Sequence, residues 1–330
     1  MSPRVLVTGA GGQIGSELVA ALRRRYRDDA VMATDKVTGR TSGRPGRLEE
    51  LDVTDQSSVE RTVKEHDIDT IYHLAAILSA VGEENPDLAW DVNMRGLKNV
   101  LDAAVRSGVG RVFWPSSIGV FGPNAPKEMA TQDTQLSPAT MYGVTKVAGE
   151  LLCGYYSLKH RLDVRCLRFP GLVSSEALPG GGTTDYAIEM FYSALEKGSY
   201  TCFLGEHTTL PMMYMPDALR ATIEIMEADG SRVKLHTGYN LAAMSFSPAE
   251  LAAEIRKQIP SFRVTYVPDR RQQIADSWPT SIDDSRSRED WGWSPAYDLA
   301  RMTKDMLATL EGRLRHAKDV LHAPPRPGGG

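Results

Sequence analysis

The sequence of 330 residues has only three cysteines, Cys153, Cys166 and Cys202, and it contains neither a Cys-x-x-Cys nor a His-Glu-x-x-His motif. Three scattered thiols are too few for a disulfide framework, and without these ligand spacings a metal site has no support. We therefore expect no metal and a reducing, cytoplasmic setting.

Long apolar runs and a strong net charge are also missing. No stretch approaches the roughly 20 apolar residues that cross a bilayer. The beginning of the chain, "RVLVTGAGG", has no apolar signal core. The formal net charge is −4 and the pI is about 6.0, so we expect neither a membrane nor nucleic acid as a partner. A composition with 42% hydrophobic and 24% charged residues is typical of a globular enzyme that acts on a small molecule.

The first half of the chain alternates short apolar runs with helical patterns. Strands are predicted at 4–8, 30–34, 70–75, 111–116 and 164–169, and helices at about 13–25, 56–66, 87–107 and 138–160. Alternation of this kind is typical of right-handed βαβ units that form a parallel sheet covered by helices on both faces. The predicted fold class is α/β, a Rossmann-type doubly wound parallel sheet with a smaller C-terminal lobe.

The alternation of strand and helix patterns ends after Phe169. A connection rich in Pro, Gly, Ser and Thr follows, then a helix from about 186 to 197, and "GYNLA" at 238–242 predicts a strand that rejoins the sheet. We therefore predict a first domain at 1–169, rejoined by about 212–244, and a substrate-binding lobe formed by 170–211 and 245–315. The end of the chain, "APPRPGGG", cannot bury a core, so 316–330 are predicted to be a disordered tail.

The segment "VTGAGGQIG" places Gly9, Gly12 and Gly15 between the first strand and the first helix. Glycine allows a sharp turn and a close approach to a pyrophosphate, which the helix N-terminus then binds. Asp35 ends the second strand, twenty residues after Gly15, where a carboxylate accepts hydrogen bonds from ribose hydroxyls. The first domain is therefore predicted to bind NAD.

NADP is the less favoured alternative cofactor, because two cationic residues, Lys36 and Arg40, follow that aspartate. In "LDVTD", Asp52 is equally consistent with an adenine contact and with an ordinary loop residue. We expect the other dinucleotide contacts to be Gln13, Ile14, Val53, Leu74, Ala75, Ala76, Ser116, Tyr142, Lys146 and Phe169.

The stretch "MYGVTK" places Tyr142 and Lys146 four residues apart, on one face of a helix. Ser137 is a plausible N-cap and Pro138 suits the first helical position, so the helix should begin just before the tyrosine. Ser117 follows a predicted strand. Because ligands of open α/β sheets bind at the carboxyl ends of the strands, this serine and the glycine turn should lie at the same edge.

These residues fit alcohol oxidation. A phenol titrates near pH 10, and a neighbouring ammonium and an oxidised nicotinamide would both favour its ionised form. Tyr142 is then a general base, with Lys146 beside it and Ser117 holding the substrate oxygen. The same spacing recurs in Tyr155 and Lys159, but 13 residues further along the helix, roughly 20 Å from the first pair.

Several segments carry a family resemblance. The glycine turn, "HLAA", "PSSIGVFG", the Tyr142–Lys146 pair and "LRFPG" together resemble the extended short-chain dehydrogenase/reductase superfamily. Four longer segments closely resemble the epimerase-like, metal-independent L-threonine 3-dehydrogenases: "PGGGTTDYAIEMFYSALEKG", "LPMMYMPDALRAT", "YNLAAMSFSP" and "PDRRQQIADSWPTSIDD". This resemblance implies NAD-dependent oxidation of L-threonine to 2-amino-3-oxobutyrate, with hydride transfer from Cβ to NAD.

A glycine-rich turn such as "GGGTTD" could bind the substrate carboxylate through its backbone N–H groups and the hydroxyl of Thr184. A hinge between the lobes explains the same glycines equally well, and the resemblance favours Thr184 as a substrate contact. The resemblance further implies substrate contacts at Ser79 and Trp278 and a cofactor contact at Asn93. Simple core packing is the alternative for Trp278, and a solvent-facing helix position is the alternative for Asn93.

Two other functions fit the same fold. Nucleotide-sugar 4-epimerases and dehydratases share the turn and the Tyr–Lys pair but resemble a pattern with Asn before Pro after the sixth strand, where this chain has Phe169. A non-catalytic NAD sensor would commonly lose the tyrosine or the lysine. We also expect a homodimer, formed by the helices at about 87–107 and 138–160 through residues such as Leu151, Leu152 and Tyr155.

Overall fold

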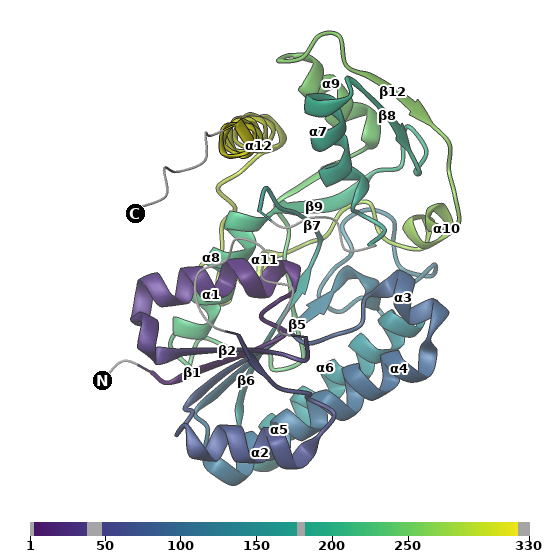
Figure 1. Cartoon of the computed structure of the whole chain (residues 1–330). Helices are drawn as coiled ribbons and strands as arrows, with labels where there is room; N and C mark the ends of the chain where they lie inside the picture. Colours follow the sequence, from purple (N-terminus) through teal and green to yellow (C-terminus); the bar gives the residue numbers. More distant parts are fainter. Residues whose placement is uncertain (1–2, 38–47, 177–181, 323–330) are drawn as a thin grey trace, which may run out of the picture.

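The computed structural model describes residues 3–37, 48–176 and 182–322. Its centre is a seven-stranded sheet in the order β10-β6-β5-β4-β1-β2-β3, in which every neighbouring pair is parallel (Figure 1). The predicted fold class is therefore confirmed. The strands are β1 (Val5–Thr8), β2 (Val31–Asp35), β3 (Leu48–Glu50), β4 (Thr70–His73), β5 (Arg111–Ser117), β6 (Asp163–Phe169) and β10 (Tyr239–Asn240).

Helices cover both faces of this sheet. One face packs against α1 (Gln13–Tyr26) and α8 (Met215–Glu227), whose buried Leu, Val, Ile and Met side chains share a core with the strands. The other face packs against α2 (Gln56–Glu65), α5 (Gly96–Ser107) and α6 (Met141–His160). The predicted strand at 238–242 does rejoin the sheet, as β10 beside β6.

Shorter elements connect these layers. They are the 3₁₀ turns η1 (Asp28–Ala30) and η4 (Ile118–Val120), α3 (Ser79–Glu84), α4 (Pro86–Trp90) and a π-helical turn η3 (Asp91–Arg95). A continuous α-helix was predicted over about 87–107. The structure instead joins α4 to α5 through the π-helical turn, an irregularity that often accompanies functional sites.

The second lobe lies beyond the carboxyl ends of the strands (Figure 1). Its core is formed by a three-stranded sheet, a two-stranded parallel sheet and the helices around them. These elements are β7 (Gly171–Val173), β9 (Leu210–Tyr214), β11 (Met244–Phe246), β8 (Ser199–Cys202), β12 (Arg263–Tyr266), α7 (Tyr186–Glu196), α9 (Pro248–Arg256), α10 (Arg271–Asp276) and α12 (Leu299–His322). One further helix, α11 (Ser285–Trp291), contacts β10.

The end of the chain departs from the prediction. Helix α12 runs to His322, so the tail expected to start at residue 316 begins inside a helix. The segment "HAKDVLH" contains good helix formers, which extend the helix by two further turns before the first proline of "APPRPGGG". The remaining residues, 323–330, lie outside the described part of the chain.

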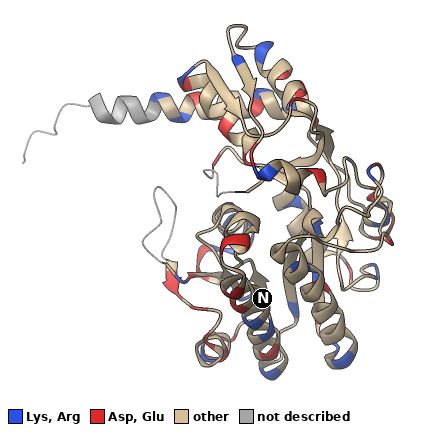
Figure 2. Cartoon of the chain, turned by 90° about the vertical axis from the view of Figure 1, so that its right-hand side faces the viewer, with Lys and Arg blue, Asp and Glu red and all other residues tan. Residues whose placement is uncertain are grey.

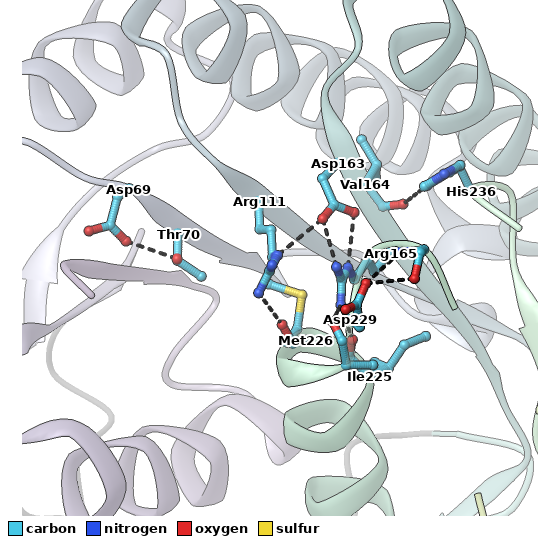
Figure 3. Close-up of polar contacts among 12 residues, drawn as sticks. Asp69, Thr70, Arg111, Asp163, Val164, Arg165, Ile225, Met226, Asp229 and His236 are labelled. Carbon is cyan, nitrogen blue, oxygen red and sulfur yellow. Dashed lines mark hydrogen bonds and ion pairs between the residues drawn. The ribbon is translucent and has the colours of Figure 1, made fainter. Parts of the chain in front are cut away.

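A buried arginine holds α8 against the amino ends of the central strands (Figure 3). Arg165 is fully buried and donates to both carboxylate oxygens of Asp163, at 2.9 and 2.7 Å, while Arg111 reaches the same carboxylate at 3.0 Å. Both arginines also donate to carbonyl groups at the C-terminal end of α8. Arg165 contacts those of Ile225 and Ala228, and Arg111 contacts that of Met226. Cations here satisfy orphan carbonyls at a negative helix end, so this edge is structural.

Along the backbone drawn in Figure 2, Lys and Arg (blue) alternate with Asp and Glu (red) in both lobes. Within the described residues, no helix combines the length and apolar character needed to cross a membrane.

Helix α6 packs tightly against β5 at Gly149. A Cβ at this position would lie 2.3 Å from Cη2 of Trp114 and 3.2 Å from Cδ2 of Leu97. We expect Gly149→Ala to lose about 1–3 kcal/mol of unfolding free energy in urea, because a rigid ring and a helix backbone must separate. Gly312→Ala is the control: it lies in α12 with open space around it and should gain about 0.5–1 kcal/mol. Equal stability of the two variants would contradict this packing.

Candidate active site

The glycine turn joins β1 to α1 at the carboxyl edge of the sheet. Gly9 has φ +69, and a Cβ there would lie 2.5 Å from the backbone nitrogen of Ala75. A Cβ at Gly15 would lie 2.3 Å from the carbonyl oxygen of Gly9. Both positions therefore require glycine, the first for its backbone conformation and both for close packing. Gly12 is the N-cap of α1, and no side chain caps this helix end.

The two predicted aspartates lie next to this turn. Asp35 accepts a hydrogen bond from the backbone nitrogen of Gly11 at 2.8 Å, which fixes its carboxylate beside the turn. Asp52 accepts from Lys36 at 2.7 Å and from the backbone and hydroxyl of Thr54 at 2.9 and 2.7 Å. Burial alone would raise the pKa of Asp52, but these hydrogen bonds hold it below its usual value. The Lys36 ammonium thus already has a counter-ion.

A cavity of about 150 Å³ opens beside the turn, between the sheet edge and the second lobe. Twelve of the predicted site residues line it: Gln13, Ile14, Leu74, Ala76, Ser79, Ser116, Ser117, Tyr142, Lys146, Phe169, Thr184 and Trp278. The first two lie on α1, the next three follow β4, and the last two belong to the second lobe. Residues from distant parts of the sequence therefore meet at one place, although their individual roles stay predictions.

Three other predicted contacts, Val53, Ala75 and Asn93, do not line this cavity. The carbonyl of Val53 accepts a hydrogen bond from Asn99 at 2.9 Å, and its side chain is buried. The backbone of Ala75 packs against Gly9. Asn93 is 2% exposed and pairs with both backbone groups of Ile77, at 2.7 and 3.1 Å. The solvent-facing alternative for Asn93 is therefore wrong: the amide holds the segment after β4 in place.

Helix α6 begins at a different residue from the one predicted. Ser137 was expected as the N-cap, but the helix starts at Met141 and the cap is Thr140, whose hydroxyl accepts from the backbone nitrogen of Gly143 at 3.1 Å. Glu83 of α3 accepts from the backbone nitrogen of Met141 at 2.6 Å. A threonine immediately before the helix and a carboxylate from outside it satisfy the first N–H groups, so the proline-bearing segment stays a loop.

Tyr142 and Lys146 both face the carboxyl end of β5. The ammonium of Lys146 donates to the carbonyl of Pro115 at 2.6 Å and lies 4.4 Å from the ring centroid of Trp114 and 5.5 Å from that of Tyr142. The Ser117 hydroxyl accepts from the backbone nitrogen of Gly119 at 3.1 Å. In contrast, Tyr155 is half exposed and Lys159 is exposed, at the far end of the helix.

Burial dominates the electrostatics of this pair. It raises the pKa of Tyr142 above the usual value for a phenol, while a hydrogen bond with Ser117 acts in the opposite direction. Burial also lowers the pKa of Lys146 to about 8, against smaller opposing effects of Cys153, Cys166 and Glu150. In this structure the phenol therefore stays protonated at neutral pH, and further positive charge beside it is needed before it can act as a base.

The second lobe lines the cavity with both polar and apolar side chains. Thr184 packs its methyl group against Gly171, where a Cβ would come within 2.5 Å. Trp278 is 7% exposed, belongs to the core of the lobe and also lines the cavity. Core packing of this side chain is therefore compatible with a position at the cavity. Ser79 is buried at the start of α3. Of the other lining residues, Gly182, Thr183 and Asp185 belong to the predicted "GGGTTD" turn, whereas sequence reasoning missed Leu78, Pro115, Ile118, Pro170, Gly171 and Leu172.

The residues present fit a dinucleotide. The uncapped N-terminus of α1 offers free N–H groups to a pyrophosphate. The side-chain nitrogen of Gln13, which lines the cavity, is buried without a hydrogen-bond partner among the described residues. No group of three or more His, Cys, Asp or Glu side chains within those residues is arranged to hold a metal ion. A Rossmann sheet, this glycine turn and a Tyr–Lys pair with a serine define a dinucleotide-dependent oxidoreductase.

Comparison with known proteins agrees with this class. The chain belongs to the NAD dependent epimerase/dehydratase family, whose model matches residues 5–242. It is 50% identical over 312 residues, 93% of this chain, to an uncharacterized epimerase/dehydratase of Staphylococcus haemolyticus, of which 98% is covered. Membership implies NAD(H) as the cofactor.

Solved structures extend the comparison. The chain is similar to a GalE-like L-threonine dehydrogenase from Cupriavidus necator in its holo form, with 50% identity, a TM-score of 0.91 and coverage of 93% of this chain and 100% of that one. For the L-threonine 3-dehydrogenase from Trypanosoma brucei the values are 42%, 0.90, 98% and 98%. A UDP-glucose 4-epimerase from Thermotoga maritima is only 20% identical, with a TM-score of 0.80 over 94% and 99%, and shares the fold.

The buried amine of Lys146 should make stability depend on pH. Its pKa is about 8 in the folded protein, against 10.5 for an unperturbed lysine, which represents the unfolded chain. Between these values the unfolded chain binds more protons, so raising the pH favours the folded state. Wild type should gain about 3 kcal/mol relative to Lys146→Met as the pH rises from about 7 to about 10.5.

The measurement is urea unfolding of both proteins across this range. Lys159→Met, which alters an exposed lysine of the same helix, is the control and should show no such trend. A difference between wild type and Lys146→Met that does not vary with pH would contradict the lowered pKa.

Proposed function

We propose that this protein oxidises L-threonine to 2-amino-3-oxobutyrate with NAD⁺. One observation carries the proposal: solved L-threonine dehydrogenases are 42–50% identical to the chain over at least 93% of its length. The geometry supports it, because Tyr142, Ser117 and Lys146 line one small cavity together with Thr184 and Trp278. The curated relatives of similar identity are described only as epimerase/dehydratases, so the substrate remains to be tested.

The reaction removes a proton and a hydride from the Cβ–OH group of the substrate. When bound, NAD⁺ supplies the hydride acceptor and a positive charge. Tyr142 accepts the hydroxyl proton as general base, and Ser117 donates a hydrogen bond to the same oxygen as it becomes a carbonyl. Lys146 adds positive charge one helical turn away, and its bond to Pro115 fixes the direction of the ammonium.

Two neighbouring threonines on the cavity wall suit the carboxylate of a small zwitterion. The buried hydroxyl of Thr183 lines the cavity and has no hydrogen-bond partner among the described residues. With Thr184 beside it, this position offers donors to a substrate carboxylate. Phe169, at 3% exposure, stands where an asparagine would be expected in a nucleotide-sugar enzyme.

Tyr142→Phe tests the proposed base. The variant should lose NADH production by about 10²–10⁴-fold, because it removes the proton acceptor, and should keep nearly unchanged NAD binding by calorimetry. Tyr155→Phe is the matched control, since it alters the tyrosine of the second Tyr–Lys pair and should retain full activity. Wild-type turnover in Tyr142→Phe would refute the assignment of the base.

The substrate is tested separately with the wild-type protein. NADH release with L-threonine, and none with UDP-galactose, is the expected result. Conversion of UDP-galactose without threonine oxidation would instead support a nucleotide-sugar 4-epimerase. The two outcomes distinguish the two functions even if Tyr142 is the base in both.

We further propose that the protein forms a homodimer through α6. Val144, Leu151, Tyr155 and Leu158 are 41%, 66%, 50% and 85% exposed and recur at spacings of seven, four and three residues, which is one stripe of a helix. A second copy of the same helix is a partner that could cover this stripe. One L-threonine 3-dehydrogenase of known structure, 49% identical to this chain, is described as monomeric, so the stripe needs a direct test.

Light scattering after size exclusion provides that test. Wild type should have the mass of a dimer, and Leu151→Glu/Leu158→Glu should have the mass of a monomer, because the substitution puts charge into the apolar contact. Val267→Glu, at a 62% exposed valine of the second lobe, should remain dimeric. A monomeric wild type would contradict the proposal.

A further inference from the structure

Three consecutive residues at the carboxyl end of β5 lie against one face of α6. The carbonyl of Pro115 accepts from Lys146 at 2.6 Å. The hydroxyl of Ser116 donates to Glu150 at 2.5 Å, and the Ser117 hydroxyl acts to lower the pKa of Tyr142. The three helix residues are spaced by four and so form one row along α6. Two of these contacts involve the proposed catalytic residues, and the third involves a carboxylate that the mechanism does not use.

That carboxylate is buried and fully engaged. The side chain of Glu150 is 2% exposed and forms a two-pronged ion pair with Arg168, at 2.8 and 2.7 Å. Gly238 closes the space around it, because a Cβ there would lie 2.7 Å from Oε1. Arg168 in turn donates to the side-chain oxygen of Asn240 at 3.1 Å. The carboxylate is therefore held directly from β5 and β6, and through Arg168 from β10.

Sheet register explains why these groups meet. Ser116 of β5 lies opposite Arg168 of β6, and Arg168 lies opposite Asn240 of β10. The three polar side chains thus form a row across the sheet, perpendicular to the strands. Glu150 joins this row to the helix. A buried ion pair contributes little net stability compared with an apolar packing of the same volume, so stability alone gives no reason for this one.

We propose that Glu150 is a positioning residue of the reaction: its buried carboxylate holds Ser116, and with it Pro115 and Ser117, in register with Lys146 and Tyr142. A shift of β5 relative to α6 by a fraction of an ångström would change the direction of the Ser117 hydroxyl and of the Lys146 ammonium together. Losses of activity from such misplacement are large compared with their effect on binding.

Glu150 also affects the charge of Lys146. The groups that face this amine are Tyr142, Glu150 and Cys153 of α6, Cys166 of β6 and His73 of β4. Burial, assisted by the lysine charge, lowers the pKa of His73 to about 3, so this ring stays neutral in the working range. Burial also raises the pKa of the Cys166 thiol. Glu150 forms an ion pair with Arg168, and its carboxylate acts to raise the pKa of Lys146.

Glu150→Gln removes that charge and keeps the shape and the acceptor for Ser116. The pKa of Lys146 should then fall below about 8, so its proton is lost at lower pH. With L-threonine as substrate, the alkaline limb of the kcat profile should move to lower pH, kcat should fall about tenfold and KM should change less than about twofold. Glu150→Asp, which keeps the charge, should restore the position of the limb. Glu196→Gln, at an exposed position of α7, is the control without effect.

A second readout does not depend on turnover. The pKa of Lys146 is measured by NMR of the cofactor-free protein with ¹³C-labelled lysine, its signal being assigned from Lys146→Arg. The value should be lower in Glu150→Gln than in wild type. This inference rests on the proposed function for its kinetic arm only. A wild type without threonine oxidation would refute the proposed function, whereas the NMR arm would still decide the role of Glu150.

The proposal is overturned if Glu150→Gln, corrected for its folded fraction, has the kcat, the alkaline limb and the Lys146 titration of wild type. Should this variant fail to fold because Arg168 is left without a partner, Ser116→Ala decides instead. It breaks the tether to β5 but leaves both charges in place. We expect it to lose kcat several-fold at unchanged KM and an unchanged alkaline limb, and unchanged kcat would overturn the proposal.

Discussion

The attachment of α6 to the carboxyl end of β5 is the constraint on which the site depends. A buried ammonium has to be satisfied by a hydrogen bond, and Lys146 finds its acceptor in the Pro115 carbonyl at 2.6 Å. This contact fixes the helix relative to the strand. It thereby also fixes the positions of Tyr142, one helical turn from Lys146, and of Ser117, two residues from Pro115. Gly149 makes the contact possible, since only glycine lets the Trp114 ring approach the helix so closely.

The second lobe completes the site without altering this attachment. Trp278 belongs to the core of the lobe and also lines the cavity, and Thr184 is held against Gly171 of β7. This side of the cavity is therefore backed by the packed core of the lobe. Under the proposed function, the residues of the chemistry lie at the sheet edge and the substrate contacts lie on the lobe, a division that lets one fold act on different substrates. The lobe residues then bear more directly on the choice of substrate than the Tyr–Lys pair does.

Patterns local in the sequence predicted the layered sheet, the glycine turn and the Tyr–Lys–Ser group, because each follows from periodicity or from a turn that only glycine can make. The sequence-based predictions failed where contacts between residues far apart in the sequence determine the local structure. Thr140 rather than Ser137 caps α6, since Glu83 from α3 supplies a further acceptor. Glu150 escaped notice because its partners lie 34 and 18 residues away and only strand register brings them together. Asn93 was predicted as a cofactor contact, but its bonds to the backbone of Ile77 could not be read from the sequence.

The electrostatics of the site explain why ionisation of the base and binding of an oxidised cofactor belong together. Burial raises the pKa of Tyr142, and the ammonium of Lys146 is directed at Pro115 rather than at the phenol. Near neutral pH the tyrosine alone is therefore a poor base. A positive charge brought next to the buried ring would favour its ionised form strongly, since little water is present to screen it. Under the proposed function, proton removal then requires the oxidised cofactor, and a site without it cannot deprotonate the alcohol.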